Sequence, residues 1–420
     1  MHKKINAILI PLVMLALLAA FFLLPSKDFS ERENRYLAPL PKLSVGTVTD
    51  GSFMEDIKDY VSDHFPFRDF WIGVNTRVGL LRGKTLINGV YFADDDYLIE
   101  KYEPSGNMSK IAKVVNDFAD KVDAKVTFMA VPTSVVINRD RLPAGTEGDA
   151  DAQLAELGEL YADLNCYTID LTEVLSERNR QGQVFYRLDH HWTNAGALAG
   201  YEEYYELISS MEDHMDPLHI YREHMRMMAS QMPTPGLISN TDDLIYYYDF
   251  TTVSDSFRGT LFNKVGECGL GFDSITSRRL PDTVFEKITI KTDDGKDIPL
   301  FDESKLETAD QYAYFLSGNH PFLTITNAIN VDRTVYITPQ GPGLKEYGTA
   351  HFPDILIIKD SYANCMIPLM LGDYHSITVI DPRYYADPIS DYVNEHGIDE
   401  VLFVYNMNML GTDLGIRRIK

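Results

Sequence analysis

The longest run of apolar side chains in the sequence lies near its N-terminus. Residues 5–25 contain a single polar side chain, that of Asn6, and two lysines precede the run. About 20 apolar residues are enough to span a bilayer, and basic residues at the short end keep that end in the cytoplasm. We therefore expect residues 1–25 to form an uncleaved signal anchor, a single transmembrane helix in the cell membrane with the bulk of the chain outside the cytoplasm. Cleavage at Ala19–Ala20 is the alternative, but the apolar run continues past that pair.

Apolar positions recur at helical spacing in the segment that follows. Residues 26–42 are charged and contain prolines, which is typical of a linker, and two helical patterns follow within residues 51–82, interrupted at Phe65–Pro66. We interpret residues 26–104 as a linker and a membrane-proximal helical region. Its aromatic side chains could mark a partner surface, but packing is the simpler explanation. The apolar positions of the two patterns are Phe53, Ile57, Tyr60, Val61, Phe70, Trp71, Val74, Val78 and Leu81.

Helical and strand patterns alternate in two further parts of the chain, residues 105–211 and 350–420. This alternation is typical of a parallel sheet flanked by helices, so we expect one α/β domain built from both parts. The expected strands are Lys125–Val131, Cys166–Asp170, Asp354–Lys359, Ser376–Asp381 and Glu400–Tyr405. The expected helices cover residues 111–122, 151–165, 194–211, 362–371 and 389–395.

The stretch between these parts, residues 212–349, lacks the alternation. It begins with a methionine-rich segment, His214–Met232, that we expect to be helical. Short strand patterns follow without intervening helices, which predicts an antiparallel, β-rich insertion. The strand candidates are Leu244–Phe250, Glu286–Lys291, Tyr314–Leu316, Leu323–Thr326 and Thr334–Ile337.

Charge and cysteine content narrow the class of protein. The 420 residues carry 62 acidic and 38 basic side chains, a net charge of -24. This excess of negative charge argues against nucleic acid or an anionic membrane surface as the main partner. The three cysteines, Cys166, Cys268 and Cys365, cannot form a complete disulfide framework, and no CxxC pair is present. We expect them to be buried free thiols.

The segment Asp189–Trp192, DHHW, carries the first candidate chemistry. In an extended segment, residues two apart point to the same face, so the Asp189 carboxylate and the His191 imidazole can pair as orienter and general base. Trp192 is expected to pack beside them and His190 to point away. Chelation of a metal by Asp189, His190 and His191, with help from His320 or His351, is the alternative. Neighbouring side chains of an extended segment point to opposite faces, so the two histidines would not bind one ion, and we expect no metal. We expect no cofactor either.

The second candidate is Ser361, which follows the expected strand Asp354–Lys359. Function in open parallel sheets gathers at the carboxyl ends of strands. The helix expected after Ser361 would present backbone N–H groups that can stabilise an oxyanion. Asp360 or Ser361 could instead simply cap that helix, and the GxSxG motif of α/β-hydrolases is absent. A serine nucleophile, a histidine base and an aspartate orienter nevertheless form a complete set for acyl transfer.

Several motifs in order carry a resemblance to a known family. They are DHHW, ILIIKDSYANC at residues 355–365, SGNHP at 317–321, DPRYY at 381–385, VLFVYNMN at 401–408, FSERENRYLAPLPK at 29–42 and FPFRDFW at 65–71. Over nearly its whole length the chain resembles the DHHW family. That family is in turn similar to the SGNH-hydrolase-like acetyltransferases of alginate biosynthesis.

The resemblance implies a fold and a set of site residues. In ordinary SGNH hydrolases the Asp–Ser turn opens the domain and the Asp/His pair closes it. Here the pair comes first, which implies a circularly permuted SGNH-like α/β domain. Ser361 would be the nucleophile, His191 the general base and Asp189 its orienter. Supporting contacts are expected from Trp192, Asp360 and Arg383, and the oxyanion asparagine would be Asn406 or Asn408, with Asn319 as a competing candidate.

The resemblance also implies a function. We expect an extracytoplasmic O-acetyltransferase that acts on a cell-surface or secreted polysaccharide of a bacterium through an acetyl-serine intermediate. Because acetyl-CoA is cytoplasmic, the acetyl group would come from a multi-pass membrane O-acyltransferase as partner. An esterase that removes acetyl groups from the polysaccharide is one alternative. A non-catalytic, glycan-binding component of an export complex is another.

Overall fold

A seven-stranded sheet forms the centre of the molecule. The computed structural model describes residues 2–30, 35–231, 249–337 and 345–419, the side chains of residues 2–10, 29, 35, 229, 231 and 337 excepted. In spatial order the strands are β10 (Ile288–Thr292), β11 (Phe322–Asn327), β15 (Ser376–Ile380), β14 (Asp354–Lys359), β16 (Glu400–Asn406), β6 (Lys125–Val131) and β7 (Tyr167–Asp170). The five strands from β15 to β7 are parallel.

The five parallel strands confirm the expected α/β architecture. Counted from β14, their spatial order is 2-1-3-4-5, the order of one common doubly wound fold. Circular permutation is an interpretation of that order and stays a prediction. The central strands β14 and β16 are apolar between their polar end residues and buried on both faces, as parallel strands require. Each fully buried Ile, Leu or Val contributes about 1.5–3 kcal/mol to this core.

Helices cover both faces of the sheet. Phe118 of α5 (Met108–Ala119) packs edge-on against Phe403 of β16, whereas Tyr204 of α9 (Asn194–Met211) donates a hydrogen bond to Glu400 of the same strand. Because residues 400 and 403 point to opposite faces of a strand, α5 and α9 lie on opposite sides of the sheet. The other helices of this domain are α6 (Ser134–Ile137), α7 (Gly148–Asp163), α8 (Thr172–Gln181), α13 (Ala363–Met366), α14 (Ile389–His396) and α15 (Met407–Leu410).

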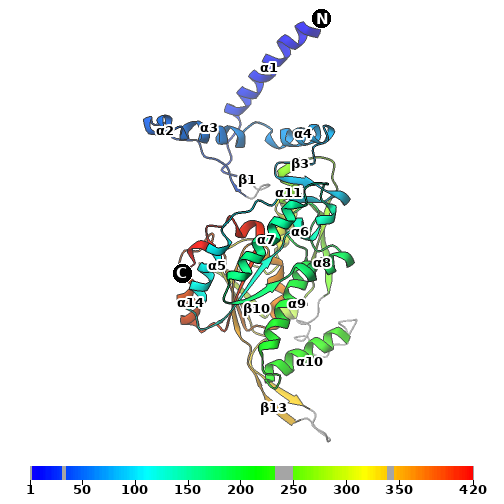
Figure 1. The fold of residues 1–420 in the computed structure, drawn as a ribbon, viewed down its shortest axis with the longest axis vertical. Helices are drawn as coiled ribbons and strands as arrows, with labels where there is room; N and C mark the ends of the chain where they lie inside the picture. The colour runs from blue at the N-terminus through cyan, green and yellow to red at the C-terminus, as the bar shows by residue number, and fades with distance from the viewer. Residues whose placement is uncertain (1, 31–34, 232–248, 338–344, 420) are drawn as a thin grey trace.

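The stretch 212–349 is joined to the central sheet. β10 and β11 continue the sheet in antiparallel orientation, with Leu323 opposite Val379 of β15. Two antiparallel strand pairs lie outside it, β8 (Phe250–Phe257) with β9 (Asp273–Arg278) and β12 (Arg333–Ile337) with β13 (Lys345–Ala350). The second pair projects from the body in Figure 1. The antiparallel strands predicted here are confirmed in kind, but β10 and β11 belong to the main sheet.

One of the strand candidates in this stretch is wrong, and a second cannot be compared with the structure over most of its length. Gln311–Tyr314 is a 3-10 helix and Leu316 and Ser317 have positive φ, so the chain turns at 314–316 where a strand was expected. Most of the candidate at 244–250 lies outside the described residues. The short helices α11 (Thr260–Val265) and α12 (Asp282–Phe285) complete the stretch.

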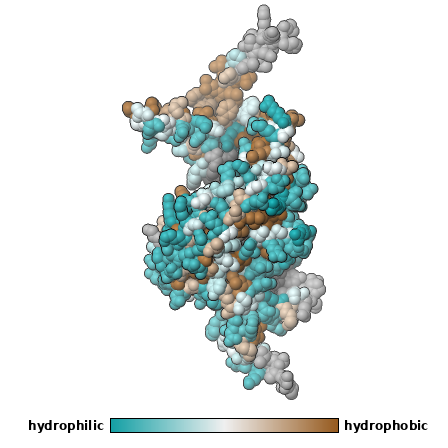
Figure 2. Space-filling view, viewed as in Figure 1, coloured by the Kyte–Doolittle hydropathy of each residue, from teal (hydrophilic) through white to brown (hydrophobic). Residues whose placement is uncertain are grey.

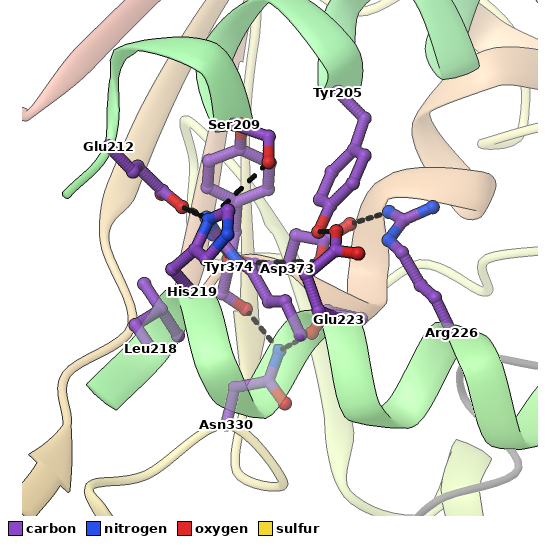
Figure 3. A network of polar contacts seen from close by, with 12 residues as sticks. Tyr205, Ser209, Glu212, Leu218, His219, Glu223, Arg226, Asn330, Asp373 and Tyr374 are labelled. Carbon is purple, nitrogen blue, oxygen red and sulfur yellow. Dashed lines mark hydrogen bonds and ion pairs between the residues drawn. The ribbon is translucent and has the colours of Figure 1, made fainter. Parts of the chain in front are cut away.

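The predicted methionine-rich helix is α10 (Pro217–Gln231), and a buried ionic network fastens it to the sheet domain (Figure 3). Arg222 is fully buried and bonds Glu212 at 2.7 Å, while Arg226 bonds Asp373 at 2.6 Å. Asp373 follows the 3-10 helix Ile367–Gly372 on the sheet domain. Since removing one partner leaves a buried charge uncompensated, the network holds the helix strongly in place.

The N-terminal part contains α1 (His2–Leu23), which projects from the body (Figure 1). Within the described part of the chain, no helix combines the length and apolarity needed to cross a membrane, so the transmembrane helix expected at residues 1–25 is not found there. The remaining elements of this part are β1 (Phe29–Ser30), β2 (Arg35–Tyr36), α2 (Val45–Thr49), α3 (Ser52–Asp63), α4 (Arg68–Leu81) and a small sheet of β3 (Leu86–Ile87), β4 (Val90–Phe92) and β5 (Leu98–Glu100).

The two helices predicted within residues 51–82 are confirmed as α3 and α4, but the packing role expected for the aromatic side chains Phe70 and Trp71 of α4 is wrong. No residue of α3 is buried, and Phe70 and Trp71 of α4 are 61% and 40% exposed. Figure 2 shows apolar side chains gathered on the surface of the N-terminal helices. The reason is that α4 buries its small residues, Gly73, Thr76 and Gly79, instead.

Candidate active site

A tight loop between α8 and α9 presents the DHHW residues. Phe185 and Trp192 form an isolated antiparallel bridge, and the backbone N–H of Tyr186 donates to the carbonyl of His191 at 3.1 Å. These bonds place Asp189 and His191 in the tip of the loop. Trp192 is fully buried and its indole N–H donates to the carbonyl of Tyr362 at 2.8 Å. Trp192 therefore ties this loop to the turn that carries Ser361.

The Asp360–Ser361 turn stands at the carboxyl end of β14. The buried carboxylate of Asp360 accepts the N–H of Tyr362 at 2.8 Å on one oxygen. Its other oxygen accepts the backbone and side-chain N–H groups of Asn406, at 2.8 and 2.7 Å. Asp360 thus joins the ends of β14 and β16 and fixes the backbone on which Ser361 stands.

The structure brings Asp189, His191 and Ser361 together. Nδ1 of His191 lies 2.5 Å from Oδ1 of Asp189, and Nε2 lies 2.7 Å from Oγ of Ser361. The ring of Tyr312 stacks on the imidazole, with 3.8 Å between centroids and 11° between planes. Ser361 and His191 are 170 positions apart in the sequence, so the fold creates this contact.

The Asp189 carboxylate is held by backbone as well as by the imidazole. It accepts the N–H of His191 at 2.9 Å and the N–H of Thr260 at 2.6 Å. Gly259 makes this approach feasible, because a Cβ there would lie 2.1 Å from Oδ2 of Asp189. Burial works to raise the pKa of Asp189, but the imidazoles of His191 and His190 outweigh it and hold that pKa well below its usual range. The carboxylate is therefore ionised.

The imidazole of His191 is poised to act as a base. Burial first, and the neighbouring His190 second, lower the pKa of His191 to about 4 against the opposing effect of Asp189. The ring is therefore neutral at neutral pH. With Nδ1–H donating to Asp189, Nε2 is left to accept the hydroxyl proton of Ser361, as a general base requires.

His190 does not point away as expected. Its ring centroid lies 3.9 Å from that of His191, because the loop bends here and the alternation of an extended strand does not apply. Ligand-type atoms of Asp189, His190 and His191 lie within 4.8 Å of one another, which is compact enough for an ion. Both ring nitrogens of His191 are, however, within hydrogen-bond distance of Asp189 and Ser361, and neither His320 nor His351 lines the cavity. The geometry matches a proton relay better than an ion site.

Two of the three predicted oxyanion asparagines are directed elsewhere. Asn406 caps α15, accepting the N–H of Met409 at 2.9 Å, and its amide donates to Asp360. Asn408 donates to Glu100 at 3.0 Å. Neither lines the cavity beside Ser361. The reason is that the chain turns into α15 directly after β16, which carries both side chains away.

Asn319 is the candidate that reaches the cavity, together with Asn364, which sequence reasoning missed. The ammonium group of Lys359 donates to Oδ1 of Asn319 at 2.9 Å and to Oδ1 of Asn364 at 2.8 Å. Lys359 is 1% exposed, and burial lowers its pKa to about 8, with Asp381 opposing the shift. A charged residue at the end of an otherwise apolar strand was the signal in the sequence.

The helix after Ser361 is shorter than predicted. Only Ala363–Met366 is α-helical, and a 3-10 segment with Pro368 near its start replaces the rest. A four-residue helix aligns few peptide dipoles. The helix therefore offers little stabilisation of negative charge at Ser361.

A cavity of about 200 Å³ adjoins the serine. Arg383 lines it, as predicted for a supporting residue, with its guanidinium held by two hydrogen bonds to Asp381 at 2.8 and 2.5 Å. Oγ of Ser361 and the His191 ring face the same space. The other lining residues include His190, Phe257, Thr260, Asn263, Asp310, Tyr312, Tyr384 and Met409. The cavity has room for a small acyl group.

Comparison with known proteins supports the resemblance seen in the sequence. Residues 91–223 match the family described as the SGNH hydrolase-like domain of the acetyltransferase AlgX. This stretch contains Asp189 and His191 but not Ser361. The expected similarity to that superfamily is thereby confirmed over these residues. No curated protein sequence matches the chain.

Several solved structures resemble the fold, among them a DHHW family protein and PatB1. A DHHW family protein from Eubacterium siraeum is 20% identical, with a TM-score of 0.54, 79% of this chain and 96% of that one being covered. PatB1 of Bacillus cereus, solved with a sulfonyl adduct, is 18% identical, with a TM-score of 0.51. The match covers 79% of this chain and 98% of the PatB1 chain. At this identity the similarity concerns the fold, and function depends on the site.

Proposed function

We propose that the protein is a serine-dependent O-acetyltransferase that modifies hydroxyl groups of a polysaccharide through an acetyl-serine intermediate. One observation carries the proposal: Oγ of Ser361 lies 2.7 Å from Nε2 of a neutral His191 whose other nitrogen is paired with Asp189. A hydroxyl group on this relay is a nucleophile, and such a nucleophile performs acyl transfer.

In the first half-reaction, His191 takes the hydroxyl proton as Oγ of Ser361 attacks the acetyl carbonyl. The imidazolium that forms is stabilised by the ionised Asp189. The carbonyl oxygen becomes an oxyanion, for which the amide of Asn319 is the donor in the cavity wall, since the amide of Asn364 already donates to Oδ1 of Asn319 at 3.2 Å. The tetrahedral intermediate then collapses, the leaving group departs with the proton from His191, and an acetyl ester remains on Ser361.

In the second half-reaction, a sugar hydroxyl replaces the leaving group. His191 takes its proton, the sugar oxygen attacks the acetyl-serine carbonyl, and the amide of Asn319 stabilises the new oxyanion. Collapse returns the proton to Oγ of Ser361 and releases the acetylated sugar. No bound ion or redox step enters this balance.

The identity of the acyl group and of the acceptor rests on the resemblance to acetyltransferases of alginate biosynthesis and on the family match at residues 91–223. Location outside the cytoplasm, by means of the apolar N-terminal segment, belongs to the same proposal. So does a multi-pass membrane O-acyltransferase as the source of acetyl groups, because acetyl-CoA would not be available outside the cytoplasm.

The experiment that tests the proposal combines an acetyl-ester donor with a neutral oligosaccharide. Acetylated sugar, found by mass spectrometry, supports transfer. Free acetate without acetylated sugar would assign the protein as an esterase. Absence of both, with no acetyl group on Ser361, would indicate a non-catalytic component. Covalent labelling by a sulfonyl fluoride is a further check, since PatB1 carries a sulfonyl adduct in its structure.

A further inference from the structure

A second, larger cavity adjoins the active-site cavity. Its volume is about 640 Å³, and it lies between α4 and α11. Thr260, whose N–H donates to Asp189, lines both cavities. The two spaces therefore share one wall, and a chain-like ligand entering the active site along this wall would meet α4.

Close contacts fix this second cavity relative to the active site. Thr76 of α4 donates a hydrogen bond to the carbonyl of Val265 in α11 at 2.6 Å. Gly73 packs so tightly that a Cβ there would lie 2.9 Å from the carbonyl oxygen of Glu267. α4 is thus attached to the same short helix whose first residue holds Asp189, so ligand contacts on α4 are positioned with respect to Ser361.

The lining of the second cavity combines aromatic rings with amides. Trp71 is 40% exposed and Phe65 is 37% exposed. The polar side chains of Asn75 and Asn88 line the same space, and Asn88 is fixed by a hydrogen bond to the carbonyl of Lys264 at 2.8 Å. Rings offer flat apolar area to the C–H faces of sugars, and amides can donate to and accept from hydroxyl groups.

The charges at this cavity point to a neutral ligand. Its two cationic residues, Arg68 and Lys264, are paired with Asp63 and Glu100. Because both cations already face carboxylates, the cavity has no excess of positive charge for a polyanion. The chain's net charge of -24 acts in the same direction.

We propose that the cavity lined by Trp71, Phe65, Asn75 and Asn88 is a binding subsite for neutral sugar residues of the acceptor polysaccharide, next to the residue that receives the acyl group. One part of this proposal, that the bound chain is the acceptor polysaccharide, rests on the acyl-transfer function proposed for Ser361. Trp71 stacks on a sugar ring here, and this contact holds the chain while a hydroxyl group enters the active-site cavity across Thr260.

The tryptophan content of the chain offers a direct test. There are two tryptophans, of which Trp192 is fully buried and Trp71 is partly exposed. Titration of full-length Ser361→Ala protein with cellohexaose and maltohexaose should produce a saturable change in tryptophan emission. Calorimetry should give about 10-fold weaker binding for Trp71→Ala and a smaller loss for Trp71→Phe. Tyr167→Ala, which removes an exposed ring outside both cavities, should bind like the parent.

Several results would overturn this subsite. Binding of neither hexaose, equal binding by Trp71→Ala, or tighter binding of oligogalacturonate than of the neutral hexaoses would each do so. An emission change with phospholipid vesicles but not with sugars would assign the surface to a membrane instead. Hydrolysis of 4-nitrophenyl acetate by the parent protein separates the two proposals, because this reaction tests Ser361 without a bound sugar. A parent protein without esterase activity that still binds sugars through Trp71 would contradict the acyl-transfer function alone.

Discussion

Gly259 lies directly against the carboxylate of Asp189, and a Cβ added at Gly259 would sit 2.1 Å from Oδ2. The adjacent N–H of Thr260 donates to the same oxygen at 2.6 Å. The orienting carboxylate is thus held by a backbone that tolerates no side chain at this position, although φ of Gly259 is not in the left-handed region. The sequence distance between the two residues hides this dependence.

Gly259→Ala should therefore displace Asp189 and lower kcat/KM for acetyl-ester hydrolysis by at least 10-fold. Complete loss of the carboxylate that orients a catalytic histidine lowers activity by about 10⁴-fold, which sets the upper limit of the expected effect. Gly271→Ala is the matched control, since nothing lies within 4 Å of its added Cβ. Steady-state kinetics of both variants measure the effect. Equal activity of the two variants would contradict the role given to Asp189.

Lys359 should act as a positioning residue through Asn319 and Asn364. Lys359→Met removes the donor that orients both amides, so we expect kcat to fall by about 10²- to 10³-fold, the scale of a lost oxyanion donor, with KM nearly unchanged. Lys125→Met, at the exposed start of β6, is the control. Thermal unfolding separates this effect from loss of fold. A variant that is folded and fully active would exclude Asn319 as the oxyanion donor.

The acid limb of the pH profile should lie unusually low. Only neutral His191 can accept the proton of Ser361, so activity is present above the pKa of His191 and lost as the pH falls through it. Since burial and His190 lower that pKa to about 4, the limb should appear near pH 4 rather than near 6.5. His190→Gln removes a neighbour that lowers the pKa, so its limb should move to higher pH. The kcat/KM profiles of parent and variant test this, and an unmoved limb would contradict it.

The buried network on α10 should matter for stability rather than for activity. Arg222→Met removes the arginine partner of Glu212 and one of the two arginines at Asp373, which keeps Arg226, so the free energy of unfolding should fall by about 3 kcal/mol. Arg178→Met breaks an exposed pair with Glu202 and should change it by less than about 1 kcal/mol. Urea unfolding measures both. Similar losses in the two variants would show that burial does not decide the energetics here.

The sequence predicted the parallel sheet well because its strands are nearly continuous apolar runs. The bounds of β6 and β14 match the expected strands, and α9 matches the expected helix Asn194–Met211. These elements are defined by local patterns that tertiary contacts reinforce. The helix expected at 362–371 is divided because a 3-10 segment with Pro368 near its start replaces its second half, which the apolar pattern does not reveal.

The relay residues could be proposed from sequence because their types and order match a known chemistry. The oxyanion candidates could not be ranked, since the choice between Asn319, Asn406 and Asn408 depends on how separate turns fold over the serine. Asn364 and Tyr312 enter the site only through the fold and have no spacing signal relative to His191. His190 was misplaced because a bend, rather than a strand, carries the motif.

The sequence also did not predict that the aromatic side chains of α4 are exposed. Helical spacing predicts a buried face, but α4 buries glycine and threonine and leaves Phe70 and Trp71 exposed. A pattern of large apolar residues shows which side of a helix is apolar, but it does not show what that side packs against. The second cavity and its partly exposed tryptophan follow from this inverted packing.

The most direct test of the central claim is mass spectrometry of the full chain after brief incubation with 4-nitrophenyl acetate. Ser361 of the parent should carry a single acetyl group, and the label should transfer to an added oligosaccharide. Ser361→Ala should carry none, with acetyl release reduced on the order of 10⁴-fold. Acetyl transfer by Ser361→Ala at the rate of the parent, or acetylation of the parent at another residue alone, would contradict the account.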